Sequence, residues 1–349
     1  MTTPMTLAAA CGLLLAIALI AWQGPGAVVQ ALAGVGLGAL WIVLVRSLQI
    51  AGAGYAWWLL LPAASGSQLR GCLLLRWVRD AINTLLPVAQ IGGEIVGARL
   101  LGAWRVGGGL AGASVLVDLL VQTATQLAFA FLGVFLLARL GGEQRLIRWL
   151  LVGLAVMTVA VVGFFASQRM GGVRVLERLL LRIAASPRWR ALVSVGNVHE
   201  ALGVIYARHA PLAAAAGVHL IVWFIGALEI WIALAYMGYS VGYPEALAIE
   251  SLGHAVRAAG FLIPAGLGVQ EGGFAAICAV LGIPAPAAIA LSLVKRVPEI
   301  ALGIPGLIAW RVVEAREKRG AAWPAAGAEP DASQARCLHK DTAGRPPAK

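Results

Sequence analysis

Two short stretches of this sequence place a glutamate after a proline and a group of glycines, within apolar surroundings. "LLPVAQIGGE" occupies residues 85–94, and "LIPAGLGVQE" occupies residues 262–271. In each stretch the glutamate follows the proline by seven residues. Proline removes a backbone donor and glycine permits close approach of backbones, so both stretches are predicted to interrupt helices. The backbone amides freed at such a break could bind an anionic or hydroxylated group.

An ionisable residue follows each of these glutamates at the same distance. Asp118 lies 24 positions after Glu94, and Lys295 lies 24 positions after Glu271. A charge at the centre of a bilayer costs at least about 2.5–3.5 kcal/mol on insertion scales, so each charge needs a partner or water. The matched spacing suggests that the two stretches belong to an internal repeat.

Two alternatives remain for the charges that this repeat places in the membrane. In the first, Asp118 and Glu271 neutralise basic residues as structural ion pairs. Their partners would be Lys295 or Arg296, and Glu299 could pair with the basic residues one turn before it on the same helix. In the second alternative, which we favour for the set as a whole, the charges surround a polar cavity. Glu229 and Glu250 are further interior carboxylates, whereas His219 and His254 are predicted to be packed core side chains.

A substrate-binding site is therefore predicted on the two interrupted segments and the helices that follow them. Its candidate residues are Pro87, Gln90, Gly92, Gly93, Glu94, Arg99, Asp118, Arg257, Pro264, Gly266, Gly268, Gln270, Glu271, Lys295, Arg296 and Glu299. No cofactor or metal site is predicted, because the four cysteines are scattered and form no CxxC or Cys/His cluster. Motifs of the GxSxG, HExxH and Walker types are absent from the sequence.

The composition indicates which kind of element must position these residues. Of 349 residues, 60% are hydrophobic and 12% are charged, whereas soluble domains carry roughly 25% charged residues. Apolar runs of about 20 residues span a bilayer as helices, so we predict an all-α polytopic membrane protein. Six spans are expected near residues 6–22, 27–45, 108–138, 146–166, 211–238 and 286–310. Two interrupted, re-entrant segments are expected at 47–105 and 240–285.

The distribution of basic residues suggests an orientation for these spans. Positive residues favour the cytoplasmic side, which assigns both termini, 46–80 and 169–208 to the cytoplasm. The net charge of +11 then reflects contact with anionic lipid rather than with nucleic acid. The loop at 139–148 should face outward although it carries three arginines, which is contrary to this rule.

The predicted spans divide into two halves that form one membrane domain, residues 1–319. The halves, 6–138 and 146–310, would be related as a three-plus-three inverted repeat, an arrangement found in transporters. Between them, arginines spaced by four residues at 174, 178 and 182 predict an amphipathic helix. That helix either lies on the inner leaflet or packs as a lid on the ends of the spans. Residues 320–349, rich in Ala, Pro and small polar residues, are predicted to be a disordered cytoplasmic tail.

With "NTLLPVAQIGGE", "IPAGLGVQEGGF" and "SLVKRVPEIALGIPGLIAW", the chain resembles the membrane domain of lysylphosphatidylglycerol synthases over roughly residues 7–315. Segments 195–212, 227–238 and 246–264 resemble more narrowly the hopanoid-biosynthesis-associated members. The resemblance implies movement of lipids, in particular of hopanoids or related lipids, in a bacterial inner membrane. The short tail makes us expect no cytosolic aminoacyl-transfer domain, so the synthase activity is not carried over.

The sequence thus predicts a lipid transporter or flippase rather than an enzyme. Its partners would be a hopanoid or phospholipid substrate, the membrane, and lipid-synthesis or export proteins. No nucleotide site is found, so movement would be passive, proton-linked or driven by a partner, and carboxylates are the natural proton carriers. Two alternatives stay open: an intramembrane transferase that acts on a lipid headgroup with the carboxylates as general base, and a non-catalytic scaffold for lipid-synthesis enzymes.

Overall fold

The structure, a computed structural model, describes residues 33–63, 68–86, 92–170, 196–259 and 269–318. Within these ranges the chain is helical and contains no strand, which confirms the predicted all-α class. The described elements are α3 (Gly38–Leu60), α4 (Leu69–Leu85), α5 (Gly92–Leu101), a π-helical turn (Gly102–Val106), α6 (Gly108–Arg139), α7 (Gln144–Arg169), α10 (Gly196–Tyr206), α11 (His209–Tyr236), α12 (Tyr243–Ala259), α13 (Val269–Val280) and α14 (Ala285–Lys318).

Among the described residues, four helices are long and apolar enough to cross a membrane, namely α3, α6, α7 and α11. The last three match the predicted spans at 108–138, 146–166 and 211–238. The predicted span at 286–310 lies within α14, which has 34 residues and carries charged side chains in its middle. On α7, Val156, Val159 and Val162 are exposed, as expected for a helix whose surroundings are hydrocarbon rather than water.

The predicted span at 27–45 is wrong in its described part. A turn at Gly36, which has φ 50°, precedes a helix that begins at Gly38 and runs through Arg46 to Leu60. The helix need not end at Arg46, because the guanidinium Nη2 of this residue lies 3.2 Å from Oδ1 of Asp80. The predicted span at 6–22 lies outside the described residues.

Residues 46–80, which the distribution of basic residues assigns to the cytoplasm, contribute to α3 and α4. The side chains of Arg76 and Arg79 are buried in the protein. The rule that places arginines on the cytoplasmic side applies to arginines in loops, so these two residues carry no information about orientation.

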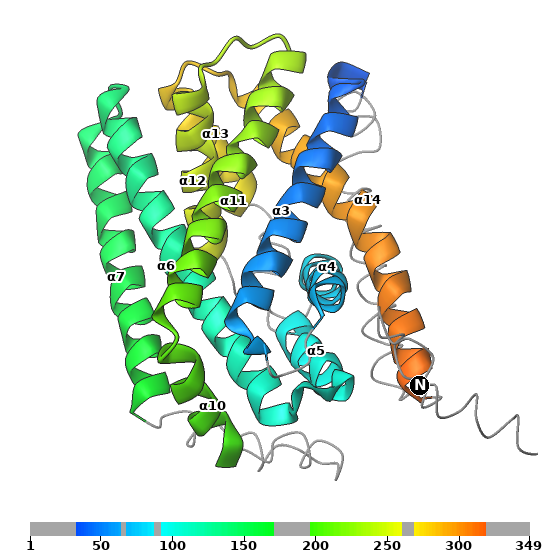
Figure 1. Cartoon of the computed structure of the whole chain (residues 1–349). Helices are drawn as coiled ribbons and strands as arrows, with labels where there is room; N and C mark the ends of the chain where they lie inside the picture. The colour runs from blue at the N-terminus through cyan, green and yellow to red at the C-terminus, as the bar shows by residue number, and fades with distance from the viewer. Residues whose placement is uncertain (1–32, 64–67, 87–91, 171–195, 260–268, 319–349) are drawn as a thin grey trace, which may run out of the picture.

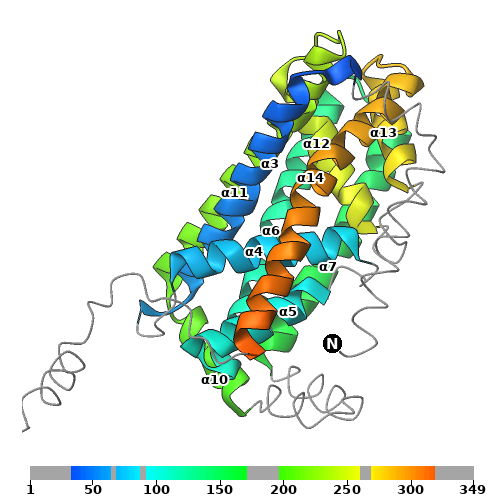
Figure 2. The same ribbon diagram turned by 90° about the vertical axis from the view of Figure 1, so that its right-hand side faces the viewer.

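The order of helices repeats along the chain. α3, α4, α5 and α6 have 23, 17, 10 and 32 residues, and α11, α12, α13 and α14 have 28, 17, 12 and 34. The long helices α3 and α11 run side by side, while the short pairs α4/α5 and α12/α13 lie toward opposite ends of the bundle (Figures 1 and 2). This order agrees with the predicted repeat, and the inverted relation of its halves stays a prediction.

Each half has an apolar core, and α14 contributes to both. In the second half, Leu252 and Phe274 pack with Leu291 of α14. In the first half, Trp57 and Leu100 pack around the other end of α14, where Trp310 and Val313 are buried. Because α14 joins the two cores, side chains from both halves are fixed relative to one another.

The predicted cytoplasmic segment at 169–208 is described only at its ends. Its last part forms α10, which packs on α6 through Leu202 and Ile205. The hydroxyl of Tyr206 donates to Oε1 of Gln168 at 2.5 Å and so joins α10 to the end of α7. The predicted amphipathic helix around 174–182 and the tail at 320–349 lie outside the described residues.

Candidate functional site

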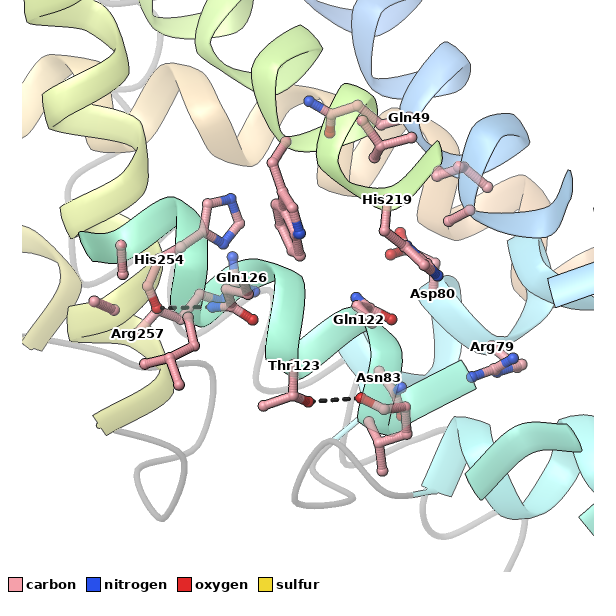
Figure 3. A pocket seen from close by; sticks show the side chains of 18 of the residues that line it. Gln49, Arg79, Asp80, Asn83, Gln122, Thr123, Gln126, His219, His254 and Arg257 are labelled. Atoms are coloured by element: carbon pink, nitrogen blue, oxygen red, sulfur yellow. Dashed lines mark hydrogen bonds between the residues drawn. The ribbon is translucent and has the colours of Figure 1, made fainter. Parts of the chain in front are cut away.

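A cavity of about 320 Å³ opens among α3, α4, α6, α11 and α12. Figure 3 looks into it and shows polar side chains converging from these helices. Its polar lining consists of Arg46, Gln49, Arg76, Arg79, Asp80, Asn83, Thr84, Glu94, Gln122, Thr123, Gln126, His219, His254 and Arg257. Helical spacing explains much of this set, since side chains three and four residues apart share one helix face. α4 contributes Arg76, Asp80 and Asn83 in this way, and α6 contributes Gln122 and Gln126.

Asp118 is the centre of a buried group that we call the Asp118 cluster, formed with Arg76, Arg79, Glu94 and His219. Oδ2 of Asp118 lies 3.1 Å from Nη1 of Arg76 and 3.0 Å from Nη1 of Arg79. Oδ1 of Asp118 lies 3.1 Å from Nε2 of His219. Arg79 also donates to Oε2 of Glu94 through its Nη2. The cluster therefore contains two guanidinium groups and two carboxylates.

Close contact between α4 and α5 positions Glu94 in this cluster. The amide N–H of Gly93 donates to Oδ1 of Asn83 at 2.8 Å, and Nδ2 of Asn83 lies 3.2 Å from Oε1 of Glu94. A side chain at Gly97 would lie 2.5 Å from Cδ of Arg79, so glycine at this position leaves the room that the arginine occupies. The expectation that the amide of Gly93 is open to a ligand is wrong, because Asn83 already binds it.

A second buried group, the Lys295 cluster, consists of Glu229 on α11, Glu250 and His254 on α12, and Lys295 on α14. Nζ of Lys295 donates to Oε2 of Glu250 at 2.6 Å and lies 3.2 Å from Oε2 of Glu229. Nε2 of His254 lies 3.0 Å from Oε1 of Glu250. His254 lines the cavity, and the other three members lie behind its wall.

α11 takes part in both clusters. It contributes His219 to the Asp118 cluster and Glu229 to the Lys295 cluster. Ten residues of helix correspond to about 15 Å along the axis. Between them, Trp223 lines the cavity, donates its indole N–H to Oγ1 of Thr125 at 3.1 Å, and contacts the ring of His254 at 5.0 Å between centroids.

Two further ion pairs contribute arginines to the cavity wall. Arg46 pairs with Asp80 at 3.2 Å, and Nη1 of Arg257 donates to Oε1 of Glu299 at 2.7 Å. Among the described residues the lining thus contains four arginines and two carboxylates, because Asp118 and Glu299 lie behind it. The surface of the cavity is consequently richer in positive charge than the layer behind it.

Some arginine donors in the wall have no partner among the residues that the structure describes. Nε of Arg76 and Nε of Arg79 are buried and make no hydrogen bond. A buried donor without an acceptor carries a desolvation cost. Because both Nε atoms are closed off from the cavity surface, an anionic group in the cavity would act on the charge of these guanidinium groups. The arrangement is therefore suited to binding an oxygen-rich group.

The structure brings only part of the predicted site together. Glu94 and Arg257 line the cavity, and Asp118, Lys295 and Glu299 bind lining residues directly or through Glu250. Arg99 and Arg296 are not among the described residues that line it, and Arg99 pairs with Glu314 at 3.2 Å. Gly92 and Gly93 begin α5. Outside the described residues lie Pro87, Gln90, Pro264, Gly266 and Gly268, together with the side chains of Gln270 and Glu271.

The predicted ion pairs are corrected in two places. Asp118 and Lys295 belong to separate clusters, so the expected direct pair between them is wrong. Glu299 binds Arg257 of α12 and not Lys295, while the charge of Arg296 on its own helix also acts on it. In both places a principal partner comes from a neighbouring helix, α4 for Asp118 and α12 for Glu299.

Sequence reasoning missed several residues of the cavity, among them Arg76, Arg79 and Asn83. Their spacing of three and four residues marks one helix face and could have identified them, but their charge led to their assignment to the cytoplasm. The two histidines were predicted to be packed core side chains. His219 is indeed buried, yet it also lines the cavity, as does His254.

The fold and the cavity define a polytopic all-α membrane protein with a buried polar site. A family model described as the lysylphosphatidylglycerol synthase TM region matches residues 9–305. The chain therefore belongs to this family, which indicates a lipid-related function in a membrane. Comparisons with curated proteins and with solved structures find no match.

Proposed function

We propose that this protein moves lipids in the inner membrane of a bacterium, and that the cavity receives the polar headgroup of the lipid. The observation that carries this proposal is a polar, arginine-lined cavity of about 320 Å³ between helices apolar enough to cross a membrane. Membership in a family of lipid-related membrane regions supports it. An intramembrane cavity with ionisable side chains is the usual form of a substrate pathway.

The size of the cavity suggests which part of the lipid enters. A volume of about 320 Å³ is at the lower end for small-ligand pockets, so a headgroup fits and a whole lipid does not. Arginine can bind phosphate or carboxylate with two parallel hydrogen bonds. Gln122 and Asn83 provide amide donors and acceptors for hydroxyl groups. The hydrocarbon part would stay in the bilayer.

The lipid class that we propose is hopanoids or related lipids. This choice rests on the resemblance of segments 195–212, 227–238 and 246–264 to hopanoid-associated relatives. The described part of these segments includes α10, the two ends of α11 and most of α12, and α12 supplies His254 and Arg257 to the cavity. Lipid-synthesis or export proteins would be the partners that deliver or remove such a lipid.

Reconstitution tests the proposal directly. The purified protein is placed in liposomes that contain a fluorescent lipid, and the fraction accessible to an external quencher is followed with time. Wild-type protein should accelerate relocation of the lipid between leaflets, and Glu94→Gln should reduce the rate at least tenfold because Arg79 and Asn83 lose a charged partner. Glu314→Gln, which removes a carboxylate from an ion pair outside the cavity, is the matched control. Equal relocation with and without protein would overturn the proposal.

One observation favours a second candidate, an intramembrane transferase. His219 beside Asp118 and His254 beside Glu250 both line or border the cavity, and a histidine oriented by a carboxylate is a common general base. Analysis of inner- and outer-membrane lipids in a deletion strain separates the candidates. Loss of one lipid species would indicate the transferase, whereas an unchanged set of lipids in the wrong membrane would indicate transport.

A scaffold for lipid-synthesis enzymes predicts a different outcome of the same lipid analysis. Deletion would then alter the lipids, but complementation with Glu94→Gln would restore them fully. Failure of this variant to complement, at normal expression, would instead support a role for the cavity.

A further inference from the structure

With a neutral His254, the Lys295 cluster contains more negative than positive charge. Among the described residues, Glu229 and Glu250 face a single ammonium group, and the side chains of Glu229, Glu250 and Lys295 are exposed by only 1%, 2% and 9%. The next cation, Arg46 of α3, is paired with Asp80. A buried excess charge is strongly unfavourable, and one proton on a carboxylate would remove it.

Hydrogen bonding distinguishes the two carboxylates. Glu250 accepts from Lys295 through Oε2 and lies next to His254 through Oε1, so both of its oxygens have partners. Glu229 approaches Lys295 through Oε2, at 3.2 Å, and its Oε1 is buried without a hydrogen-bond partner in the part of the chain that the structure describes. An ionised oxygen without a partner is less stable than a neutral one, so Glu229 is the better position for the proton.

A path of side chains connects this position with the cavity. His254 lines the cavity and is seen at its edge in Figure 3. Its Nε2 borders Glu250, whose other oxygen binds Lys295, which in turn reaches Glu229. A neutral imidazole can take up a proton at one ring nitrogen and release another from the second. One proton taken up from the cavity would thus appear on Glu229. His254 would be left as its other tautomer, and turning of its ring and of the Glu250 carboxyl would restore the starting hydrogen bonds.

We propose that the Lys295 cluster is a proton-binding site in which Glu229 carries the proton and His254 exchanges it with the cavity. The charged and titratable groups that face Glu229 are Arg46 from α3, Glu250 and His254 from α12, and Lys295 from α14. Because the site opens to the cavity, its loading is coupled to the headgroup bound there. This coupling rests on the proposed function, whereas the proton site itself does not.

Infrared spectroscopy of the detergent-purified protein tests the proton site without any lipid movement. A protonated carboxylic acid has a carbonyl band separate from that of a carboxylate. The band should be present in wild-type protein at neutral pH, lost in Glu229→Gln and retained in Glu314→Gln. Absence of the band from the wild type, or its full retention in Glu229→Gln, would overturn the proposal.

Comparison of two neighbouring variants keeps the proposal testable if folding is affected. Glutamine resembles a protonated glutamate, so Glu229→Gln should unfold at the same temperature as the wild type, whereas Glu250→Gln should unfold at a lower temperature. The reverse order would show that Glu229 is ionised. His254→Gln should keep the infrared band but slow its exchange into heavy water at least tenfold, and unchanged exchange would exclude His254 as the path.

The coupling is tested in the liposomes that contain fluorescent lipid. A pH difference across the membrane should change the relocation rate at least threefold in wild-type protein and leave the rate of Glu229→Gln unchanged. A relocation rate of the wild-type protein that does not change with the pH difference would overturn the coupling. If the wild type moves no lipid at all, the proposed function fails, and the infrared result alone then decides whether the proton site stands.

Discussion

The Asp118 cluster and the Lys295 cluster are built alike but with opposite charges. Each centres on an ionisable residue of the long helix that ends its half, α6 or α14. Each takes partners from the first short helix of that half, α4 or α12, and from α11. In the first cluster a carboxylate lies among guanidinium groups, and in the second an ammonium group lies among carboxylates.

This difference separates a fixed charge from an exchangeable one. Arginine does not lose its proton in proteins, so Arg76 and Arg79 remain cations whatever happens around them. Glutamate, histidine and lysine can change protonation when they are buried. The Asp118 cluster is therefore suited to binding an anionic or polar group, and the Lys295 cluster to taking up and releasing protons.

Removal of the central carboxylate should have the largest effect, because it leaves two arginines that cannot become neutral. We expect Asp118→Asn to lower the free energy of unfolding by about 3–5 kcal/mol. Glu314→Gln, in a pair whose arginine is partly exposed, should cost about 1 kcal/mol or less. Unfolding by a denaturing detergent measures both. Equal losses would contradict the distinction between the cluster and a peripheral ion pair.

Removal of the central cation from the other cluster should cost less. We expect Lys295→Met to lower the free energy of unfolding by about 2–3 kcal/mol, since Glu229 and Glu250 can bind protons once the ammonium is gone. The folded variant then binds more protons than the unfolded chain, so its stability should increase as the pH falls. The same measurement at several pH values checks this sign, and a loss as large as that of Asp118→Asn at every pH would contradict it.

Glycine-to-alanine substitutions in the equivalent short helices α5 and α13 should have smaller effects on stability, and these effects should differ between the two halves. At Gly97 of α5 a methyl group meets Arg79, whereas at Gly272 of α13 none of the described residues lies within 4 Å of it. Gly97→Ala should therefore cost about 1–2 kcal/mol, and Gly272→Ala should stabilise the helix by about 0.5–1 kcal/mol. Thermal unfolding in detergent compares them. A gain of stability for Gly97→Ala would show that Arg79 is free to move away from α5.

The helical class and most long helices could be predicted from the sequence, because apolar runs such as 108–138 have only one stable form in lipid. The start of α3 could not be predicted from the sequence, because it depends on a turn at Gly36 within an apolar run. It also depends on an ion-pair partner for Arg46, which comes from α4. The same cause explains the assignment of residues 46–80 to the cytoplasm. A charged residue is predicted to be exposed when its ion-pair partner cannot be identified from the sequence. The partners of Arg76 and Arg79 lie on other helices.

Part of the site could also be predicted. The equal spacing from Glu94 to Asp118 and from Glu271 to Lys295 identified the centres of both clusters. It could not identify their partners, which come from α4, α11 and α12 and depend on how these helices pack. Glu229 and Glu250 were recognised as interior carboxylates, but only the packing of α11 and α12 against α14 shows that they share one lysine.

The position of α11 has a mechanical consequence. A helix does not shorten along its axis, so α11 keeps His219 and Glu229 at a constant separation. A rotation of α11 about its own axis would withdraw both side chains from their partners in one movement. The two clusters would then release together, and a state in which only one of them is broken would require α4 or α12 to move by itself.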